Sequence, residues 1–597
     1  MNAKSLLAQA GLCLLSMVGN AREELPEKKN VLFIMSDDFN YWLHSIGYYP
    51  QVKTPNLDKL ASEGVLFTNA YCSSPVSNPS RNALWSGLRP STTGIDNNAG
   101  GYVRDRAGFE DIVTMNQYFL QNGYWVYGAG KLYHPSSMND NPYIDKDNWS
   151  ERYKGGTGSK GGKFLKWKNP GWSSMSYSVN EESMNEENCS DYEMVNEVAQ
   201  YIKDYAKSAH KDQPFFIGCG VFRPHLPWNV PMDFWNMYKT EDLKIPESCL
   251  DKVYADIPWL KTSSAHRGVL DAGKWKEAIH AYISLMTMTD SNIGILLDAL
   301  ASTPYKDNTI ICFMGDHGWH LGEKEQWGKA TLYDEANHTS LIIYDPSAQG
   351  NGKVCRKVVS LQDLYPTLVE QCGLPAKADI EGNSLHALLQ EPESKDWNKP
   401  VVSTYSGSNY IKTNEWRYVR SKGGDRDMLF DMVKDPSECN NLINDRKYAG
   451  VIKKLNAELD SILAIGTRLR EEKLKGEKPQ IPGKALTVKL GDKELKGTIN
   501  RTCVKSKVVK RERLLLDLLS SDPYCTLIIY DESGKEMLKK TVPGEQDMEL
   551  ELPSGMGDGN YYLFVKEHDG SSVEKFVVKG KNKKKKNNNY YPINNLL

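Results

Sequence analysis

Three features are missing from this sequence of 597 residues: a paired-cysteine motif, an excess of one charge, and a long hydrophobic run beyond its first residues. The 11 cysteines are scattered without a C-x-x-C pair, so a cysteine-ligated zinc site is not expected. The formal net charge of -2 gives no reason to expect nucleic acid binding, and an anionic ligand would need a local cluster of cations. Because no later apolar run reaches membrane-spanning length, no membrane span is predicted.

The N-terminal residues have the pattern of an export signal. Lys4 gives a positive start, Leu6–Val18 is largely apolar but too short to cross a bilayer, and Gly19–Ala21 places small residues where a signal peptidase cuts. A buried N-terminal helix is the alternative interpretation. We assign residues 1–21 to a signal peptide and expect a periplasmic or secreted protein.

Apolar runs that end abruptly in polar residues recur along the chain. Asn30–Asp38 reads NVLFIMSDD, Pro214–His225 reads PFFIGCGVFRPH and Asn308–His320 reads NTIICFMGDHGWH, and the composition of each predicts a buried strand. Helical patterns that stop at Gly64 and Gly123 precede two further strands. Strands that alternate with helices predict an α/β fold with a mostly parallel central sheet covered on both faces. In such sheets ligands bind beyond the carboxyl ends of the strands, where these polar residues stand.

The C-terminal third has a different pattern. Short alternating strands and an Asp435-Pro436 turn, followed by a helical pattern, predict a small C-terminal antiparallel α+β subdomain. Strands joined by turns at 532–534 and 569–570 predict an appended β-sandwich. The final lysine and asparagine tract predicts a solvated tail, with contact to an acidic glycan as the alternative. The predicted segments are 28–395 for the α/β domain, 396–474 for the subdomain, 475–484 for a linker, 485–580 for the sandwich and 581–597 for the low-complexity tail.

Acidic residues at two strand ends suit a metal ion. Asp37, Asp38, Asp316 and His317 together offer three carboxylates and one imidazole. A hard divalent cation with a preference for oxygen ligands fits this set, so calcium or magnesium is expected before zinc. A group of hydrogen-bonded loop acids is the alternative, but three neighbouring carboxylates repel each other when no cation lies between them.

A second group of residues suits an anion. Pro79 fits the first turn of a helix that begins near Ser77 or Asn78, and a helix N-terminus offers free N–H groups and a positive dipole. Arg81 adds a fixed cationic fork. Further donors can come from Lys131, His134, His225 and Lys329. One divalent cation beside several basic side chains suits a sulfate or phosphate monoester.

Several blocks of the sequence carry a resemblance to a known family. SNPSRNALWSGLRP, which begins at Ser77, is similar to the signature of the type I, formylglycine-dependent sulfatases, in which a cysteine or serine is followed by x-P-S-R. NVLFIMSDD, GAGKLYH, GDHGWHLGE and LFDMVKDPSECNNL match other blocks of that family over roughly Asn30 to Asp460. GKLYHP, FRPHLPW and DHGWHLGEKEQWGK are most similar to the iduronate-2-sulfatase branch. The resemblance implies the alkaline-phosphatase-like sulfatase fold, in agreement with the α/β pattern.

The resemblance gives the signature serine a chemical role. A plain serine hydroxyl is a poor nucleophile, but in this family the residue is oxidised to formylglycine, whose hydrate is the nucleophile. Ser77 occupies that position, and a serine there implies maturation by an anaerobic, serine-type sulfatase-maturing enzyme of the bacterial kind. Calcium is the implied metal, with magnesium as the alternative. The implied ligands are Asp37, Asp38, modified Ser77, Asp316 and His317.

The same resemblance assigns the remaining catalytic roles. Arg81, Lys131 and Lys329 are implied to stabilise the charge on the sulfate oxygens. A sugar alkoxide is a poor leaving group, so a general acid is required, and we expect His225, assisted by Lys329. We expect His134 to be the base that takes the proton of the second hydroxyl of the hydrate, so that sulfate is released and the aldehyde forms again. For each histidine a hydrogen-bonded structural role is the alternative.

Three parts of the sequence bear on the substrate. Trp319 and His320 follow the DHG block and are expected to shape a sugar pocket. The segment STTGIDNNAGGYVRDR (91–106) is where substrate contacts are expected, and it departs from the iduronate-2-sulfatase branch. The insertion at 150–178 holds lysine, glycine and tryptophan residues, which fit either contact with a sulfated glycan or a surface loop.

These observations predict a hydrolase that removes sulfate from a sulfated carbohydrate. The leading substrate is a 2-O-sulfated uronic acid of heparin, heparan, chondroitin or dermatan sulfate, and sulfated galactose, fucose or hexosamine is the alternative. The intact S-x-P-S-R motif disfavours a phosphomonoesterase, and the filled catalytic positions disfavour a glycan-binding protein without activity. The expected partners are a sulfated oligosaccharide and the maturing enzyme, without nucleic acid.

Overall fold

The chain forms two compact units, Met1–Lys473 and Leu474–Leu597, which are described separately. The computed structural model describes residues 28–134, 148–153, 155, 165–181, 184–185, 189–246, 257, 260–475, 486–490, 493–497, 502–504, 508–510, 513–533, 535–553, 556, 558–566 and 571–579. The predicted signal peptide (1–21), nearly all of the predicted linker and the predicted tail (581–597) lie outside the described residues. The domain boundaries drawn from the sequence therefore stay a prediction.

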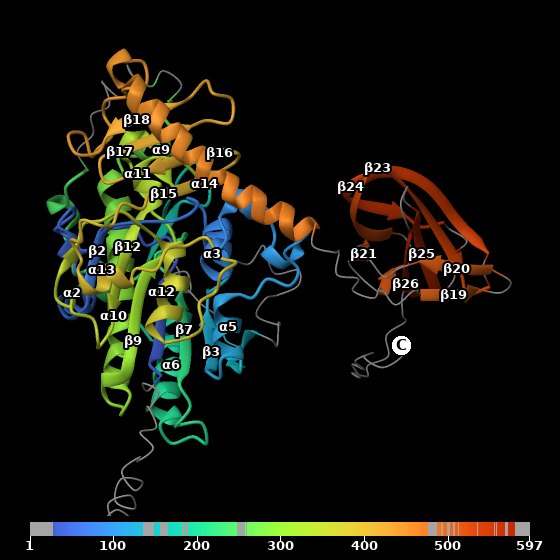
Figure 1. Ribbon diagram of the computed structural model, residues 1–597, viewed down its shortest axis with the longest axis horizontal. Coiled ribbons are helices and arrows are strands. Elements are labelled where there is room, and N and C mark those ends of the chain that lie inside the picture. Colours follow the sequence, from blue (N-terminus) through green and yellow to red (C-terminus); the bar gives the residue numbers. More distant parts are fainter. Residues whose placement is uncertain are drawn as a thin grey trace, which may run out of the picture. The chain divides into compact units, whose positions relative to one another are not determined.

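A large sheet forms the centre of the first unit (Figure 1). Its order among the described residues is β13-β2-β12-β9-β1-β7-β3-β4, with β14 paired to β2. Strand β1 is parallel to β7 and β9, and β3 is parallel to β7, whereas β12 is antiparallel to β9 and β2. The predicted mostly parallel α/β sheet is confirmed. The strands are β1 (Asn30–Ser36), β2 (Val65–Tyr71), β3 (Trp125–Gly130), β4 (Glu151–Arg152), β7 (Phe215–Val221), β9 (Thr309–Gly315), β12 (His338–Tyr344), β13 (Val354–Cys355) and β14 (Val359–Ser360).

The apolar sequence of β1 follows from burial on both faces of the sheet. Leu32 and Ile34 belong to the core on one face, and Val31 and Phe33 belong to the core on the other. Alternate side chains of a strand point to opposite faces, so a strand covered on both sides has apolar residues at every position between its ends. The prediction of a buried strand from NVLFIMS is confirmed.

Helices cover the two faces. The core on one face includes side chains of α2 (Pro55–Glu63), α6 (Ser190–Tyr205) and α10 (Trp275–Ala301), and the core on the other includes side chains of α3 (Ser77–Ser86), α5 (Met115–Gln121) and α12 (Leu364–Gln371). The shorter helices are α4 (Pro90–Thr93), α7 (Met232–Trp235), α9 (Ser264–Asp271), α11 (Asp334–Asn337) and α13 (His386–Gln390), with 3-10 turns at His44–Ile46, Val103–Asp105, Thr240–Asp242, Lys306–Asn308, Glu323–Glu325, Leu361–Asp363 and Arg446–Tyr448.

Smaller sheets complete the first unit. Strands β5 (Leu165–Lys168), β6 (Ser176–Asn180) and β8 (Trp228–Pro231) form one, and β10 (His320–Leu321) pairs with β11 (Trp327–Gly328). The C-terminal subdomain is an antiparallel sheet, in the order β15-β16-β17-β18, covered by a long helix. This subdomain agrees with the predicted antiparallel α+β region. Its elements are β15 (Val401–Tyr405), β16 (Ser408–Lys412), β17 (Trp416–Arg420), β18 (Met428–Asp431) and α14 (Ala449–Lys475).

The second unit is built from strands. Its described residues form one sheet in the order β21-β23-β25-β26-β22, with β24 on β23, and a separate β19-β20 hairpin. Most of these pairs are antiparallel, and β22 runs parallel to β26. The strand-rich character predicted for this region is confirmed, and the packing of two sheets into a β-sandwich stays a prediction. The strands are β19 (Leu486–Leu490), β20 (Lys493–Gly497), β21 (Thr502–Val504), β22 (Val508–Lys510), β23 (Arg513–Asp531), β24 (Glu536–Glu551), β25 (Gly559–Lys566) and β26 (Ser571–Lys579).

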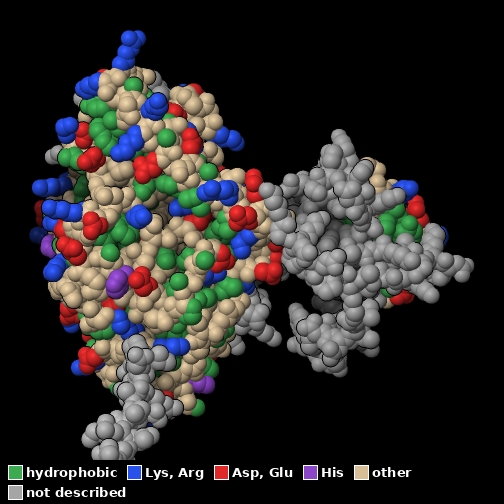
Figure 2. Space-filling view, viewed as in Figure 1, with side chains coloured by type: hydrophobic (Ala, Val, Ile, Leu, Met, Phe, Trp, Pro, Cys, Tyr) green, Lys and Arg blue, Asp and Glu red, His purple; other side chains and the backbone are tan. Residues whose placement is uncertain are grey.

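Basic and acidic side chains are mixed on the surface of the first unit. Figure 2 shows basic and acidic side chains interspersed over the drawn face of the first unit, without a broad area of one charge. This pattern agrees with the near-zero net charge, and any recognition of an anion must come from a local site. Among the described residues, no helix combines the length and the apolar character that a membrane crossing requires.

Candidate active site

Five strands of the central sheet end at the same edge. Strands β1, β3, β7 and β9 run parallel, and β2 shares their direction because both β2 and β9 are antiparallel to β12. The residues that follow these strands therefore converge, as a parallel sheet requires. They are Asp37 and Asp38 after β1, Ser77 after β2, Lys131 and His134 after β3, His225 after β7, and Asp316 and His317 after β9.

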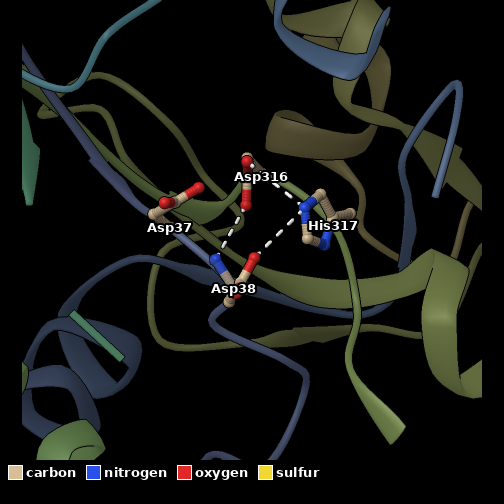
Figure 3. Close-up of side chains that lie close together, drawn as sticks. All are labelled: Asp37, Asp38, Asp316 and His317. Carbon is tan, nitrogen blue, oxygen red and sulfur yellow. Dashed lines mark hydrogen bonds and ion pairs between the residues drawn. The ribbon is translucent and has the colours of Figure 1, made fainter. Parts of the chain in front are cut away.

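Four of these residues form a buried cluster (Figure 3). One ligand atom from each of Asp37, Asp38, Asp316 and His317 lies within 4.8 Å of the others. The backbone N–H of Asp38 donates to Asp316 Oδ1 at 3.0 Å, and His317 Nε2 lies 3.4 Å from Asp38 Oδ1 and 3.5 Å from Asp316 Oδ2. The four residues predicted as metal ligands are thus brought together.

The cluster fits a hard divalent cation. His317 Nδ1 lies 2.8 Å from the carbonyl oxygen of Gly318, the geometry of an Nδ1–H donor, which leaves the lone pair of Nε2 facing the carboxylates. Burial also lowers the pKa of His317, which favours the neutral ring that a metal requires. Asp38 Oδ2 is buried and has no hydrogen-bond partner among the described residues. Carboxylate oxygens with one neutral imidazole nitrogen suit calcium or magnesium.

The backbone at Asp38 is fixed in a rare conformation. Its φ is 61°, in the left-handed region that Asp and Asn tolerate better than other non-glycine residues. The Tyr282 hydroxyl from α10 donates to the Asp38 carbonyl at 2.7 Å and accepts from the Asn40 N–H at 3.0 Å. A residue in the middle of a helix therefore holds the loop that carries two of the acids.

Basic side chains surround the acids. Arg81 donates from Nη2 to Asp37 Oδ1 and from Nε to Asp316 Oδ2, each at 3.0 Å. Lys131 is paired with Asp37, and Lys329 Nζ lies 2.6 Å from Asp38 Oδ1. The predicted cationic residues thus contact the predicted metal ligands directly.

These pairs set the protonation of the acids. Burial by itself would raise the pKa of Asp37, but the nearby Lys131, His225 and Arg81 outweigh it and hold the pKa well below its usual range. For Asp38, burial raises the pKa, and Lys329 offsets only part of the rise.

Ser77 is the first residue of α3, as the position of Pro79 predicts. Its Oγ lies 2.9 Å from His317 Nε2, 3.2 Å from Asp37 Oδ1 and 3.2 Å from Lys329 Nζ. The other nitrogen of His317 contacts a backbone carbonyl and not a carboxylate, so the geometry is not that of a Ser-His-Asp triad. The serine hydroxyl therefore faces the acidic cluster, and the imidazole beside it, His317, belongs to the predicted metal-ligand set.

Two histidines stand at the rim of the cluster. His225 Nε2 lies 3.8 Å from a carboxylate oxygen of Asp37 and of Asp38, and its side chain is 27% exposed. The buried Arg223 guanidinium donates to the carbonyl oxygens of His225 at 2.5 Å and Pro227 at 2.6 Å, which fixes this segment. His134 is half-buried after β3. Burial lowers the pKa of each ring to about 3, so both are neutral at pH 7 in this structure.

The two residues expected to shape the sugar pocket are buried. Trp319 is only 2% exposed, and Lys329 Nζ lies 5.7 Å from the centroid of its ring. His320 is fully buried, with Nε2 2.8 Å from Thr331 Oγ1. Both side chains lie behind the surface of the site, and direct contact with a sugar stays a prediction for them.

The structure adds residues that the motifs did not single out. Asn98 Oδ1 accepts a hydrogen bond from the N–H of Asn78 at 3.0 Å, beside Ser77. Asn98 belongs to the segment 91–106, where substrate contacts are expected from the sequence, but nothing in the pattern distinguished it from its neighbours. Tyr282 gave no signal either, because an aromatic residue inside an apolar helix is normally part of a core.

Comparison with protein-family models gives two matches. The model described as Sulfatase matches residues 29–374, and the model described as N-sulphoglucosamine sulphohydrolase, C-terminal, matches residues 315–464. The first covers more than half of the chain and includes each residue of the cluster.

Individual relatives agree with the family match. A protein named sulfatase from Formosa agariphila is 32% identical over 483 residues, which cover 75% of this chain and 90% of that protein. Mouse iduronate 2-sulfatase is 27% identical over 534 residues, which cover 71% of this chain and 93% of that protein. Among solved structures, the phosphonate monoester hydrolase of Agrobacterium radiobacter has a TM-score of 0.59 at 20% identity, and covers 74% of this chain and 96% of that one. That likeness concerns the fold alone.

Proposed function

Because the chain belongs to the sulfatase family, we propose that it removes sulfate from a 2-O-sulfated uronic acid of a glycosaminoglycan, after oxidation of Ser77 to formylglycine. The single observation that carries the chemistry is the position of Ser77. Ser77 is the first residue of helix α3, and its Oγ lies within 3.2 Å of Asp37 Oδ1, His317 Nε2 and Lys329 Nζ. The positive end of the α3 dipole and the Lys329 ammonium therefore meet at Ser77 Oγ, which suits an anionic ester.

Two groups that the chain must acquire complete the site. Formylglycine at position 77 would supply an aldehyde hydrate that attacks the sulfur of the ester. Asp37, Asp38, Asp316 and His317, together with modified Ser77, would hold calcium, or magnesium as the alternative, which supplies positive charge beside the sulfate oxygens.

The chain's own cations bind and orient the sulfate group. Lys329 Nζ stands 3.2 Å from Ser77 Oγ, so an anion held at residue 77 lies within its reach. Burial lowers the pKa of Lys131, but its partner Asp37 favours the charged form, and Arg81 stays charged beside Asp37 and Asp316. These side chains are already oriented by the acids, so little reorganisation is needed when sulfate binds.

The two histidines move protons. His225 presents Nε2 toward the cluster, while its Nδ1 lies 2.6 Å from the carbonyl oxygen of Leu226, which fixes the ring. We assign His225 as the acid that protonates the sugar oxygen, assisted by Lys329. Because its ring is neutral before substrate binds, this role requires that the negative charge of the bound ester raise the pKa of His225, so that Nε2 carries the proton that the sugar oxygen receives. We assign His134 as the base that takes the proton of the second hydroxyl at residue 77, so that sulfate leaves and the aldehyde forms again.

Replacement of His225 by alanine tests the acid role through the leaving group. His225→Ala should reduce kcat/KM on a saccharide sulfate by about 100-fold or more, because a sugar alkoxide must be protonated as it leaves. The loss on 4-nitrophenyl sulfate should be much smaller, since nitrophenolate leaves without a proton. Sulfate release from both substrates is the measurement.

His210→Ala is the matched control, because His210 stacks on Trp125 away from the cluster. It should retain both activities. Equal losses on the two substrates in His225→Ala would contradict the assignment of His225 as the acid and leave it a positioning role.

The substrate is tested with a panel of sulfated saccharides. Disaccharides with sulfate on uronate O2 should release sulfate, and those with sulfate only on hexosamine N, O4 or O6, or on galactose or fucose, should not. Ion chromatography measures the free sulfate. Faster hydrolysis of 4-nitrophenyl phosphate would favour a phosphomonoesterase on the same fold, and saccharide binding without turnover would favour a glycan-binding protein.

Maturation and export are tested by mass spectrometry. In protein made with an anaerobic serine-type maturase, the peptide that contains Ser77 should be lighter by two hydrogens, and protein made without it should carry plain serine and be inactive. The N-terminal peptide of material from the native host should begin after residue 21 if the protein is periplasmic or secreted, as proposed. Active protein with unmodified Ser77 would contradict the formylglycine proposal.

A further inference from the structure

A tryptophan from the insertion lies next to the site. Trp172 stands in the turn between β5 and β6, within the insertion at 150–178. Its ring stacks on Trp319, with centroids 6.0 Å apart and an interplanar angle of 26°. Lys329 Nζ lies 5.7 Å from the centroid of Trp319 and 3.2 Å from Ser77 Oγ. Trp172 of the insertion is thus connected to Ser77 through Trp319 and Lys329.

The turn that carries Trp172 is firmly anchored. Asn169 is buried, its Nδ2 donates to the Ala265 carbonyl at 2.8 Å, and its Oδ1 accepts from the Gly171 N–H at 2.8 Å. Ser264 Oγ donates to the Gly171 carbonyl at 2.8 Å. A Cβ on Gly171 would lie 1.9 Å from the Ser264 carbonyl oxygen, so the turn sits directly against the start of α9. The ring of Trp172 is therefore held in place and not left on a free loop.

The ring also lies against the residue before Lys329. A Cβ on Gly328 would lie 2.7 Å from Trp172 Cη2, and the φ of Gly328 is +84°. Only glycine permits both this backbone conformation and this close approach. The contact places the indole of Trp172 directly beside the backbone of the loop that delivers the Lys329 ammonium.

Of the two stacked rings, Trp172 is the one that can reach a ligand. Trp319 is 2% exposed and lies underneath, whereas Trp172 keeps part of its surface open. The Lys329 side chain beside them is 15% exposed, so the site opens at this point. A partly exposed indole beside a cation suits a sulfated sugar, because an ammonium can face the sulfate while a flat ring can pack against the C–H groups of a pyranose.

We propose, on the basis of the sulfatase function proposed above, that Trp172 is a specificity-determining residue whose ring stacks on the sugar that bears the sulfate. Lys329 then holds the charged group, and Trp172 orients the pyranose relative to Ser77. The substrate class follows from this pairing: a pyranose with one unsubstituted apolar face. Trp172, from the insertion at 150–178, thereby supplies the recognition element.

The experiment compares three replacements in the matured enzyme. Trp172→Ala removes the ring, Trp172→Leu keeps apolar volume against Gly328 but has no flat face, and Trp172→Phe keeps an aromatic face. Trp167→Ala is the matched control, because Trp167 is a partly buried tryptophan of the same insertion that packs against Tyr177, with ring centroids 6.2 Å apart. Thermal midpoints confirm that each variant folds.

The expected result is a change in substrate binding. On the saccharide that the wild type uses, Trp172→Ala and Trp172→Leu should lower kcat/KM about ten-fold or more, mainly through KM, while Trp172→Phe and Trp167→Ala stay near wild type. In a Ser77→Ala background, which cannot turn over, calorimetry should show the same loss of affinity for that saccharide when Trp172 is also replaced by alanine. Binding thereby reports on Trp172 without any contribution from the chemical step.

The possible outcomes distinguish a failure of the proposed role of Trp172 from a failure of the proposed sulfatase function. A wild type that releases sulfate while Trp172→Leu matches it in KM and in affinity overturns the role of Trp172 alone. A loss confined to kcat, with unchanged affinity in the Ser77→Ala background, also overturns it, because stacking must appear in binding. A matured wild type that releases sulfate from none of the saccharides overturns the proposed function, and this inference with it.

Discussion

Ser77→Ala should abolish sulfate release, with a loss in kcat of about 10,000-fold or more, since a methyl group can neither be oxidised to formylglycine nor attack sulfur. Ser77 Oγ is the atom on which Asp37, His317 and Lys329 converge, so no neighbouring hydroxyl can substitute for it. Initial rates on a saccharide sulfate and on 4-nitrophenyl sulfate should fall together. The loss on both substrates distinguishes this variant from His225→Ala.

Ser86→Ala is the matched control for this prediction. Ser86 is a buried serine of the same helix, and its Oγ donates to the Asn82 carbonyl at 2.6 Å, away from the cluster. Ser86 Oγ also accepts from the Leu88 N–H at 3.2 Å, so the variant loses two hydrogen bonds. It should lose about 2 kcal/mol of stability and keep its activity. Residual turnover above one tenth of wild type in Ser77→Ala would mean that residue 77 is not the nucleophile.

Asp38→Asn should remove metal binding and lower kcat by about 1,000-fold. Asn tolerates the left-handed backbone at this position, so the replacement removes a charge without straining the loop. It also leaves the Lys329 ammonium, 2.6 Å from Asp38 Oδ1, without its charged partner. In the wild type, calcium at about 100 times its Kd should stabilise the unit by about 2.7 kcal/mol, and this gain should vanish in the variant.

Thermal unfolding with calcium and with a chelator measures that gain directly. Asp290→Asn is the matched control, because Asp290 is a buried carboxylate outside the cluster whose Oδ1 accepts from the Leu57 N–H at 2.8 Å. Its baseline stability should fall, but its gain from calcium should persist. A wild type that gains no stability from either calcium or magnesium would contradict the metal site.

The acidic cluster could be predicted because its signal is local. An apolar strand that ends in two acids, and another that ends in Asp-His, are visible as short patterns. The carboxyl ends of parallel strands meet at one edge, so alternation of strands and helices is enough to place Asp37, Asp38, Asp316 and His317 together. The start of α3 at Ser77 was predictable for the same reason, since Pro79 marks a first helical turn.

Other features depend on contacts between distant segments. No local pattern distinguishes Tyr282 from the rest of its apolar helix, yet its hydroxyl holds the Asp38 carbonyl. The sequence singled out Trp319 for the sugar pocket, and packing buries it beneath the ring of Trp172, so its contact with a sugar stays a prediction. Which of two neighbouring tryptophans faces solvent is decided by what covers each one, and the covering turn comes from a separate insertion anchored on α9.

The sequence by itself determined the α/β fold, the family and the candidate nucleophile, metal-ligand and cationic residues. These follow from hydrophobic periodicity, strand ends and a short signature, all of which act within a few residues along the chain. Only the tertiary structure decided how those residues are paired: Arg81 between Asp37 and Asp316, Lys329 on Asp38, and Trp172 against Gly328. The physical reason is that such pairing depends on the order and register of strands and on side-chain volumes across the core, which no single segment of sequence specifies.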